Sequence, residues 1–223
     1  RYAPQAEHVP VGRHEPGKVA ETHAAIDRRI VEEAAAGRCV VRLKGGDPLV
    51  FGRTAQELAV AREHGIPCSI VPGVTSACAA AAEEEFPLTA RGTAGAVVFV
   101  TGHRMHGVPE PRWDLLARCN ETIVVYMGAA RAAEIAKRLI DGGRSPAEPT
   151  AIVHAASRSE RRVRYQRLHE LIDGAAEPAC KPPCVIVIGP VVRLGKSCPV
   201  ELGGTVSIGP RNASLVSERR VDA

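Results

Sequence analysis

Two adjacent glycines, an aspartate and a proline follow a short apolar run in "VVRLKGGDPLVFGR", residues 40–53. Such a run is typical of a buried strand, and glycines directly after it leave backbone without Cβ at the strand's carboxyl end. Ligands of open α/β sheets bind at that edge. The carboxylate of Asp47 could accept hydrogen bonds from ligand hydroxyls or balance a cationic group. The loop therefore predicts a small-molecule site, with an ordinary strand-to-helix turn as the alternative.

A second loop of the same kind lies at "VPGVTSA", residues 71–77. Proline and glycine again follow an apolar run, and Thr75 and Ser76 stand at the expected start of a helix. The N–H groups at a helix start, together with two hydroxyls, suit a carboxylate or the polar edge of an adenosine. Simple capping of the helix is the alternative. Two such loops could face one ligand.

Neither loop matches the common nucleotide-binding motifs. Lys44 precedes the glycines, no Gly-Lys-Ser or Gly-Lys-Thr follows them, and the chain contains no Gly-x-Gly-x-x-Gly. These absences argue against nucleoside triphosphates and NAD. The motif "HRMH", residues 103–106, contains two histidines but has no acid or thiol ligand beside them, so we expect no metal.

Helix and strand patterns alternate along the chain. Helices are expected over residues 22–36, 54–64, from 75 or 76 onward, and 132–140, and strands over 38–43, 66–72, 96–102, 121–128, 149–155 and 184–192. Thr54-Ala55-Gln56-Glu57 is typical of a capping box. The alternation predicts an α/β fold in which βα units form a mostly parallel sheet.

Composition favours a globular protein of the cytoplasm. The 223 residues are 45% hydrophobic, which supports a core, and a net charge of +4 permits anionic small molecules without demanding nucleic acid. Seven cysteines form no Cys-x-x-Cys pair, and no apolar run is long enough for a membrane span or a signal sequence. Periodicity disappears after Leu194, so we expect residues 196–223 to be a disordered tail.

Taken in order, several segments resemble the uroporphyrinogen-III C-methyltransferases, a family of S-adenosylmethionine-dependent tetrapyrrole methyltransferases. The resemblance runs from residue 8 to about residue 194 and rests on Val11-Gly12, "VVRLKGGDPLVFGR", "GIPCSIVPGVTSA", "PLTARG", "VTGH" and "VVYMG". It implies two α/β domains, 1–93 and 94–195, with the cofactor in a cleft between them. It also implies a homodimer, sometimes fused to or beside another tetrapyrrole-pathway enzyme, with no nucleic-acid or membrane partner.

The resemblance implies S-adenosylmethionine as the cofactor and S-adenosylhomocysteine as its product. Matched to the family's motifs, the cofactor contacts would fall on Gly45, Gly46, Asp47, Val50, Thr75, Ser76, Met127 and Ala156. A flexible thioether such as that of Met127 can pack on an adenine ring, although core packing is an equally good explanation from sequence alone. The implied reaction is two methyl transfers to uroporphyrinogen III, which give precorrin-2 for sirohaem or cobalamin.

The eight carboxylates of that substrate require cations. Charge and position suggest Arg42, Arg91, His103, Arg104 and His106 as contributors. The family's "VGKR" reads here as Val11-Gly12-Arg13-His14, so the lysine is replaced. As catalytic candidates, Arg13 would hold carboxylates or polarise the ring, and His14 could shuttle a proton.

One departure from the family concerns the start of the chain. The family's first glycine- and proline-rich strand and loop precede the residues compared here, and this sequence begins at Arg1 without them. We therefore expect an N-terminally truncated domain with reduced stability and reduced activity.

Two other functions compete with methyl transfer. The run "SRSERRVRYQRLHE", residues 157–170, could bind RNA phosphates, but it carries a single aromatic residue, Tyr165, which is weak for base stacking. A solvated helix face is the simpler explanation of that run. A non-catalytic remnant that still dimerises is the third possibility, motivated by the absent first strand.

Overall fold

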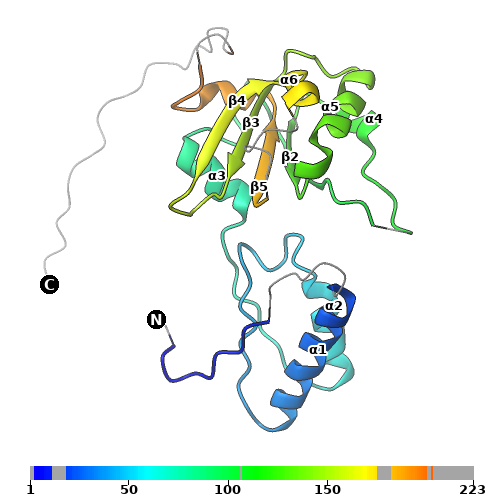
Figure 1. Ribbon diagram of the computed structural model, residues 1–223, viewed down its shortest axis with the longest axis vertical. Coiled ribbons are helices and arrows are strands. Elements are labelled where there is room, and N and C mark those ends of the chain that lie inside the picture. Colours follow the sequence, from blue (N-terminus) through cyan, green and yellow to red (C-terminus); the bar gives the residue numbers. More distant parts are fainter. Residues whose placement is uncertain (1–2, 12–18, 106, 175–181, 200–201, 203–223) are drawn as a thin grey trace, which may run out of the picture. The chain divides into compact units, whose positions relative to one another are not determined.

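The computed structural model describes residues 3–11, 19–105, 107–174, 182–199 and 202. The chain forms two compact units, Arg1–Thr75 and Ser76–Ala223 (Figure 1). The helix from Ser76 packs with the second unit, although the sequence placed it in a first domain of residues 1–93. That domain boundary stays a prediction. Most of the tail predicted at 196–223 lies outside the described residues.

The described residues of the first unit form two helices, α1 (Val19–Ala35) and α2 (Thr54–Glu63), which pack on each other. The capping box predicted at the start of α2 is wrong. Thr54 donates its hydroxyl hydrogen bond to the carbonyl oxygen of Pro48, and Glu57 binds Arg42 and Lys44. Because both side chains bind these other partners, neither caps the start of α2, and the helix has no side-chain cap there.

The strands predicted at residues 38–43 and 66–72 are also wrong. These segments form no regular secondary structure and belong to no ladder, and Val41, Leu43 and Val71 are 80%, 84% and 81% exposed. An apolar run becomes a strand only where a neighbouring backbone accepts and donates its ladder hydrogen bonds. Among the described residues of this unit, no segment forms such a ladder with them.

The second unit is built on a five-stranded sheet. Its strands are β1 (Val97–Thr101), β2 (Thr122–Tyr126), β3 (Pro149–His154), β4 (Arg162–Arg167) and β5 (Cys184–Ile188), in the order β1-β2-β5-β3-β4. Only β1 and β2 pair in parallel, so the prediction of a mostly parallel sheet is wrong. Because β5 runs opposite to both of its neighbours, β1, β2 and β3 still share one direction. The predicted α/β class is confirmed.

Strand β4 was not predicted from the sequence. It lies in the arginine-rich run that suggested a solvated helix, and it pairs antiparallel with β3 along six residues of each strand. Along β4, arginines alternate with Val163 and Tyr165. The many charges obscure the alternating pattern of a strand, and the ladder with β3 stabilises that strand.

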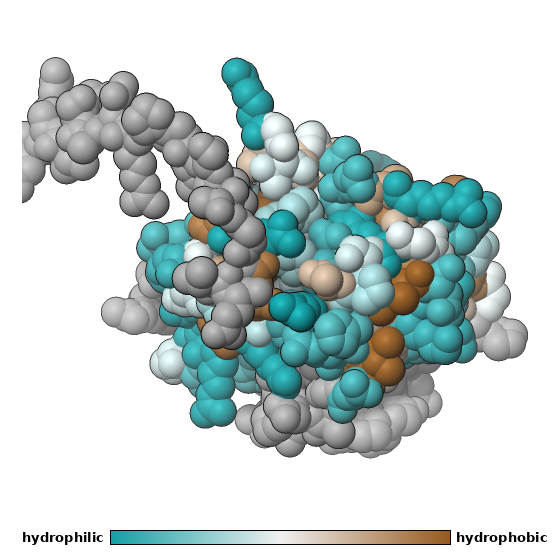
Figure 2. All heavy atoms as spheres, turned by 90° about the horizontal axis from the view of Figure 1, so that it is seen from above, coloured by the Kyte–Doolittle hydropathy of each residue, from teal (hydrophilic) through white to brown (hydrophobic). Residues whose placement is uncertain are grey.

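Helices cover both faces of this sheet (Figure 1). On one face lie α4 (Trp113–Ala117), α5 (Ala132–Asp141) and α6 (Glu170–Gly174), and α3 (Ser76–Glu84) lies on the other. Two 3-10 helices, η1 (Ala129–Arg131) and η3 (Pro190–Leu194), follow β2 and β5. The core joins Trp113, Ile135 and Leu139 from the helices to alternate residues of β2, β3 and β5. The face seen in Figure 2 is mainly hydrophilic, with separate small apolar patches.

A close backbone approach fixes the sheet where β1 and β2 end. A Cβ on Gly102 would lie 2.5 Å from the Cα of Gly128 and 3.0 Å from Cδ1 of Ile135. Only glycine therefore fits after β1, and the loops that leave the two parallel strands are held together at one edge.

We expect Gly102→Ala to lower the free energy of unfolding by about 1 to 3 kcal/mol, because the added methyl group overlaps backbone that cannot move freely. Gly95→Ala is the matched control, since a Cβ there meets nothing within 4 Å. Urea unfolding followed by circular dichroism measures both variants. Equal stability of Gly102→Ala and Gly95→Ala would contradict the close approach.

Candidate functional site

In the first unit the two glycine-containing loops touch each other. The carboxylate of Asp47 accepts hydrogen bonds from the backbone N–H of Leu49, at 2.8 Å, and of Gly73, at 3.0 Å. A Cβ on Gly73 would lie 2.4 Å from the carbonyl oxygen of Gly46. Asp47 therefore fastens one loop to the other, a role that the sequence did not reveal.

The first loop also presents hydrogen-bond donors. The backbone N–H of Val50 donates a hydrogen bond to the carbonyl oxygen of Asp47, at 3.3 Å. By contrast, no described residue accepts a hydrogen bond from the N–H of Gly45 or Gly46. Gly46 has a left-handed φ of 76°, which glycine adopts without strain. Two adjacent backbone donors without partners among the described residues are suited to a polar or anionic ligand group.

Arg42, predicted to hold substrate carboxylates, already has a carboxylate partner. Its Nε donates to Oε1 of Glu57 at 3.2 Å, and Lys44 binds the other oxygen of the same group. Both cations therefore stabilise the segment that enters the first loop. A role of Arg42 in substrate binding stays a prediction.

In the second unit, β1, β2 and β3 end at one edge of the sheet, and residues that follow β2 and β3 have unusual backbone angles. Met127 follows β2 with φ 53°, and Ala155 and Ser157 follow β3 with φ 50° and 64°. Left-handed angles at residues other than glycine cost about 1 to 3 kcal/mol each and concentrate at ligand sites. This edge is therefore the candidate site of the second unit.

Met127 is exposed at that edge. The residue is 54% exposed, which excludes the alternative that it simply fills the core. The residue before it, Tyr126, accepts a hydrogen bond at its Oη from the N–H of Ala77, at 3.3 Å. Because Ala77 lies in the first turn of α3, this contact brings Ser76 close to the end of β2. Two predicted cofactor residues, Ser76 and Met127, therefore lie in the same region, and Ala156 lies on the turn after β3.

The loop after β1 carries two further predicted cations, His103 and Arg104. His103 N–H donates to Oγ1 of Thr101 at 3.1 Å. Arg104 belongs to an arginine–glutamate network that joins the loop to η1 and α5 and consists of Arg104, Arg131, Arg138, Glu110 and Glu134. Arg131 also donates from Nη1 to the carbonyl oxygen of Gly102, at 3.0 Å. The network therefore fixes the loop where it leaves the sheet edge.

Glu110 is the centre of this network. Hydrogen bonds from Arg104 and Arg138 lower the pKa of Glu110 to about 2. Sequence reasoning missed it because its partners lie between 6 and 28 residues away. No local spacing signals such an arrangement. Arg104 is consequently engaged by carboxylates, whereas Arg91 lies exposed in a turn.

Three predicted residues are not placed by the structure. Arg13, His14 and His106 lie outside the described residues. Within the described part, no group of three or more His, Cys, Asp or Glu side chains could hold a metal ion. No helix there is long and apolar enough to cross a membrane.

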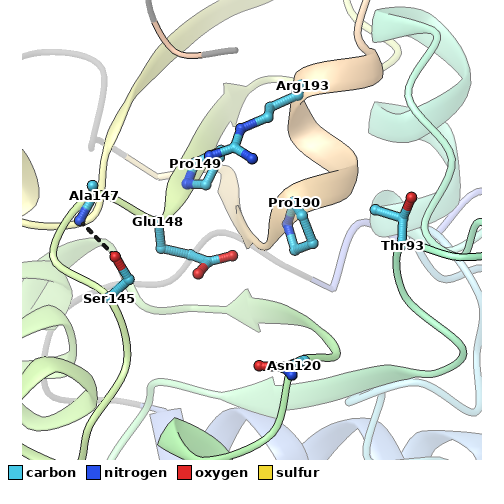
Figure 3. A pocket seen from close by; sticks show the side chains of 8 residues that line it. All are labelled: Thr93, Asn120, Ser145, Ala147, Glu148, Pro149, Pro190 and Arg193. Carbon is cyan, nitrogen blue, oxygen red and sulfur yellow. Dashed lines mark hydrogen bonds between the residues drawn. The ribbon is translucent and has the colours of Figure 1, made fainter. Parts of the chain in front are cut away.

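A pocket of about 360 Å³ lies at the opposite edge of the sheet (Figure 3). Its lining residues come from segments next to the amino ends of β1, β2 and β3 and from η3: Thr93, Asn120, Ser145, Ala147, Glu148, Pro149, Pro190 and Arg193. The Glu148 carboxylate points into the hollow and lies 3.4 Å from Arg144 Nη2. No residue predicted from sequence lines this pocket, so it is separate from the candidate site.

Comparison with known proteins identifies the family. The family model of the tetrapyrrole (corrin/porphyrin) methylases matches residues 1–172. The chain belongs to this family. The resemblance inferred from the sequence motifs is thereby confirmed, and the family is one of methyltransferase enzymes.

Solved structures of this methylase family agree in fold. A uroporphyrin-III C-methyltransferase from Thermus thermophilus, complexed with S-adenosylhomocysteine, is 40% identical, with a TM-score of 0.71 over 85% of this chain and 80% of that chain. The native form of the enzyme from the same organism is 42% identical, with a TM-score of 0.68 over 77% of this chain and 72% of that chain.

Curated relatives within the methylase family are longer proteins. Siroheme synthase 2 of Aeromonas hydrophila is 44% identical over 182 residues, which are 80% of this chain and 38% of that protein. Siroheme synthase of Neisseria meningitidis is 46% identical over 168 residues, 74% of this chain and 34% of that protein. The chain thus spans well under half of the length of these relatives.

We expect Asp47→Ala to loosen the contact between the two loops, because it removes the acceptor for Leu49 and Gly73. The amide hydrogen of Gly73 should then exchange with solvent roughly fivefold faster or more, the effect of losing one hydrogen bond of about 1 kcal/mol. NMR hydrogen exchange measures this. Glu63→Ala removes an equal charge from the exposed face of α2 and should leave Gly73 unchanged. Unaltered Gly73 exchange in Asp47→Ala would contradict the bridging role.

The arginine–glutamate network predicts a specific pH dependence of stability. Because the folded state lowers the pKa of Glu110 from 4.5 to about 2, the ionised carboxylate stabilises the fold above pH 4.5, and this contribution is lost as the pH falls to about 2. Glu110→Gln should therefore melt below wild type at neutral pH, and the gap should close between pH 4.5 and 2. Thermal unfolding across this range measures it, with Asp141→Asn in an exposed ion pair of α5 as control. A gap that stays constant with pH would refute the assignment.

Proposed function

We propose that this chain catalyses the S-adenosylmethionine-dependent C-methylation of uroporphyrinogen III. Two successive transfers would give precorrin-2 for sirohaem or cobalamin biosynthesis. The observation that carries the proposal is the 40% identity, over 85% of the chain, to a uroporphyrin-III C-methyltransferase solved with S-adenosylhomocysteine. The siroheme synthase relatives support the same pathway.

The residues present suit the proposed cofactor. Gly45 and Gly46 offer backbone donors, and the exposed residue Met127 offers a flexible, polarisable thioether as a contact for adenine. Ser76 adds a hydroxyl at a helix start, and Ala156 adds a small side chain on a turn after the sheet edge. The further contacts that we propose are Asp47, Val50 and Thr75.

S-Adenosylmethionine supplies an activated methyl group, because its sulfonium sulfur makes the methyl carbon electrophilic. The chain must therefore add three things: alignment of a pyrrole carbon with the methyl group, exclusion of water, and a group that takes the ring proton. Alignment requires loops that are held in place. Asp47 holds the loops of the first unit together, and the arginine–glutamate network holds the loop after β1 in the second. We propose His14 for the proton and Arg13 for holding carboxylates.

Recognition of the substrate depends on cations that carboxylates can reach. Arg91 and His103 are exposed, so they can bind a substrate carboxylate directly. Arg42 and Arg104 are bound to glutamates and would have to exchange one carboxylate for another. His106 completes the proposed set. The small-molecule substrate, the homodimer, a fused or neighbouring pathway enzyme and the cytoplasmic location all belong to this proposal.

RNA binding gains no support from the arginine-rich run. Arg161 is bound to Glu84 and lies 3.6 Å from Glu83, and Arg158 lies 3.8 Å from Glu160. Charges that are already paired within the chain add little to phosphate binding. Methyl transfer to a tetrapyrrole is therefore the function that the described residues favour.

Isothermal titration of S-adenosylhomocysteine into the full chain tests the proposal, with NAD as the control ligand. We expect one S-adenosylhomocysteine to bind per chain and NAD not to bind. Asp47→Ala should weaken binding, because it releases the loop that carries Gly45 and Gly46, whereas Glu63→Ala should bind as wild type does. Absence of S-adenosylhomocysteine binding would refute the proposal. Addition of two methyl groups to uroporphyrinogen III, followed by mass spectrometry, tests the reaction itself.

A further inference from the structure

Helix α3 ends in Glu83 and Glu84, Glu85 follows directly, and all three glutamates bind other parts of the second unit. Glu83 accepts a hydrogen bond from the N–H of Ser157 at 2.9 Å. Glu84 accepts from Arg161 and, at 3.1 Å, from the hydroxyl of Tyr165. Glu85 pairs with Lys196 at 3.0 Å. Carboxylates at the C-terminal end of a helix oppose its dipole, so their tertiary contacts must compensate.

Glu84 is the buried anchor of this arrangement. Its side chain is 1% exposed, and its two oxygens accept hydrogen bonds from Arg161 and Tyr165. A buried carboxylate is stable only when it is paired in this way. Burial also raises the pKa of Tyr165 to about 12, so its hydroxyl stays protonated and able to donate. The end of α3 is thereby attached to β4 and to the segment that precedes it.

Glu83 acts on the strained turn after β3. Ala155 and Ser157 both have left-handed φ angles, and hydrogen bonds from outside the turn hold it on each side. Ala155 N–H donates to the carbonyl oxygen of Pro183 at 2.8 Å, and Ser157 N–H donates to Oε1 of Glu83. Arg161 Nε lies 3.6 Å from the other oxygen of Glu83 and keeps that carboxylate in place.

The opposite end of α3 is fixed at the same sheet edge. Ala77 N–H donates to Oη of Tyr126, the residue before Met127. One rigid helix therefore connects Ser76 and the end of β2 with the turn that carries Ala156. These are the cofactor contacts proposed for the second unit.

We propose that Glu83 is a positioning residue for cofactor binding. By holding the N–H of Ser157, its carboxylate fixes the turn of residues 155–157 so that Ala156 can contact the cofactor. This inference rests on the proposed function. It adds a residue that touches no ligand itself and acts through a single hydrogen bond from α3.

Four variants of the full chain test this role by titration of S-adenosylhomocysteine. Glu83→Ala removes the acceptor and should raise the dissociation constant about fivefold, the effect of one lost hydrogen bond. Glu83→Asp keeps the charge but shortens the reach, and it should also weaken binding. Glu83→Gln keeps an acceptor oxygen and should bind nearly as wild type does. Glu85→Ala, two residues along on an exposed side chain, is the matched control.

A second readout separates positioning from general stability. Hydrogen exchange at the Ser157 amide should quicken in Glu83→Ala and Glu83→Asp, and remain at the wild-type rate in Glu83→Gln and Glu85→Ala. If Glu83→Ala does not fold, Glu83→Asp and Glu83→Gln make the same comparison. If Glu83→Ala and Glu83→Asp both bind S-adenosylhomocysteine as tightly as the wild type does, this inference is overturned, whereas the proposed function is not. Weakened binding in folded Glu83→Gln with an unchanged Ser157 amide would overturn it as well. Failure of the wild type to bind would instead refute the proposed function and, with it, this inference.

Discussion

The placement of β5 between β2 and β3 is the constraint on which the second unit depends. Because β5 is antiparallel to both neighbours, the two strands that flank it run in the same direction, as β1 does. Their carboxyl ends therefore meet at one edge, even though only one pair in the sheet is parallel. The buried side chains of β5 hold this order through the core on both faces. The candidate site of this unit is a consequence of that order.

Strain at this edge is balanced by contacts made elsewhere. Left-handed residues after β2 and β3 would relax in an isolated loop, since each costs about 1 to 3 kcal/mol. Glycines 102 and 128 fix the first two strand ends, the arginine–glutamate network holds the loop after β1, and α3 holds the turn after β3. Each restraint comes from a different element, so the shape of the edge reflects the whole unit.

The sequence predicted the elements whose signal is local. The strands around Val98, Ile123, Ile152 and Ile186 were found from buried apolar runs, and α5 from its apolar face. The same reasoning failed in the first unit, where equally apolar runs have no ladder partner among the described residues. It also failed at β4, because the arginines of this segment do not indicate a strand and the segment forms one by pairing with β3. The glycine loops of the site were visible for the same local reason. The roles of Asp47, Glu83 and Glu110 were not, because their partners are distant in sequence.

The predicted cations of each unit follow the same physical rule. The predicted cations Arg42 and Arg104 are held by glutamates, and such pairs in partly hydrated surroundings are worth little individually. A ligand with a single carboxylate would therefore gain little by displacing a glutamate that is already well placed. A ligand with many carboxylates differs, because its first contacts with a unit raise the effective concentration of its other carboxylates near the paired arginine of that unit. Under the proposed function, paired cations consequently favour a polycarboxylate such as uroporphyrinogen III over small monoanions, and selectivity arises from the number of charges on the substrate.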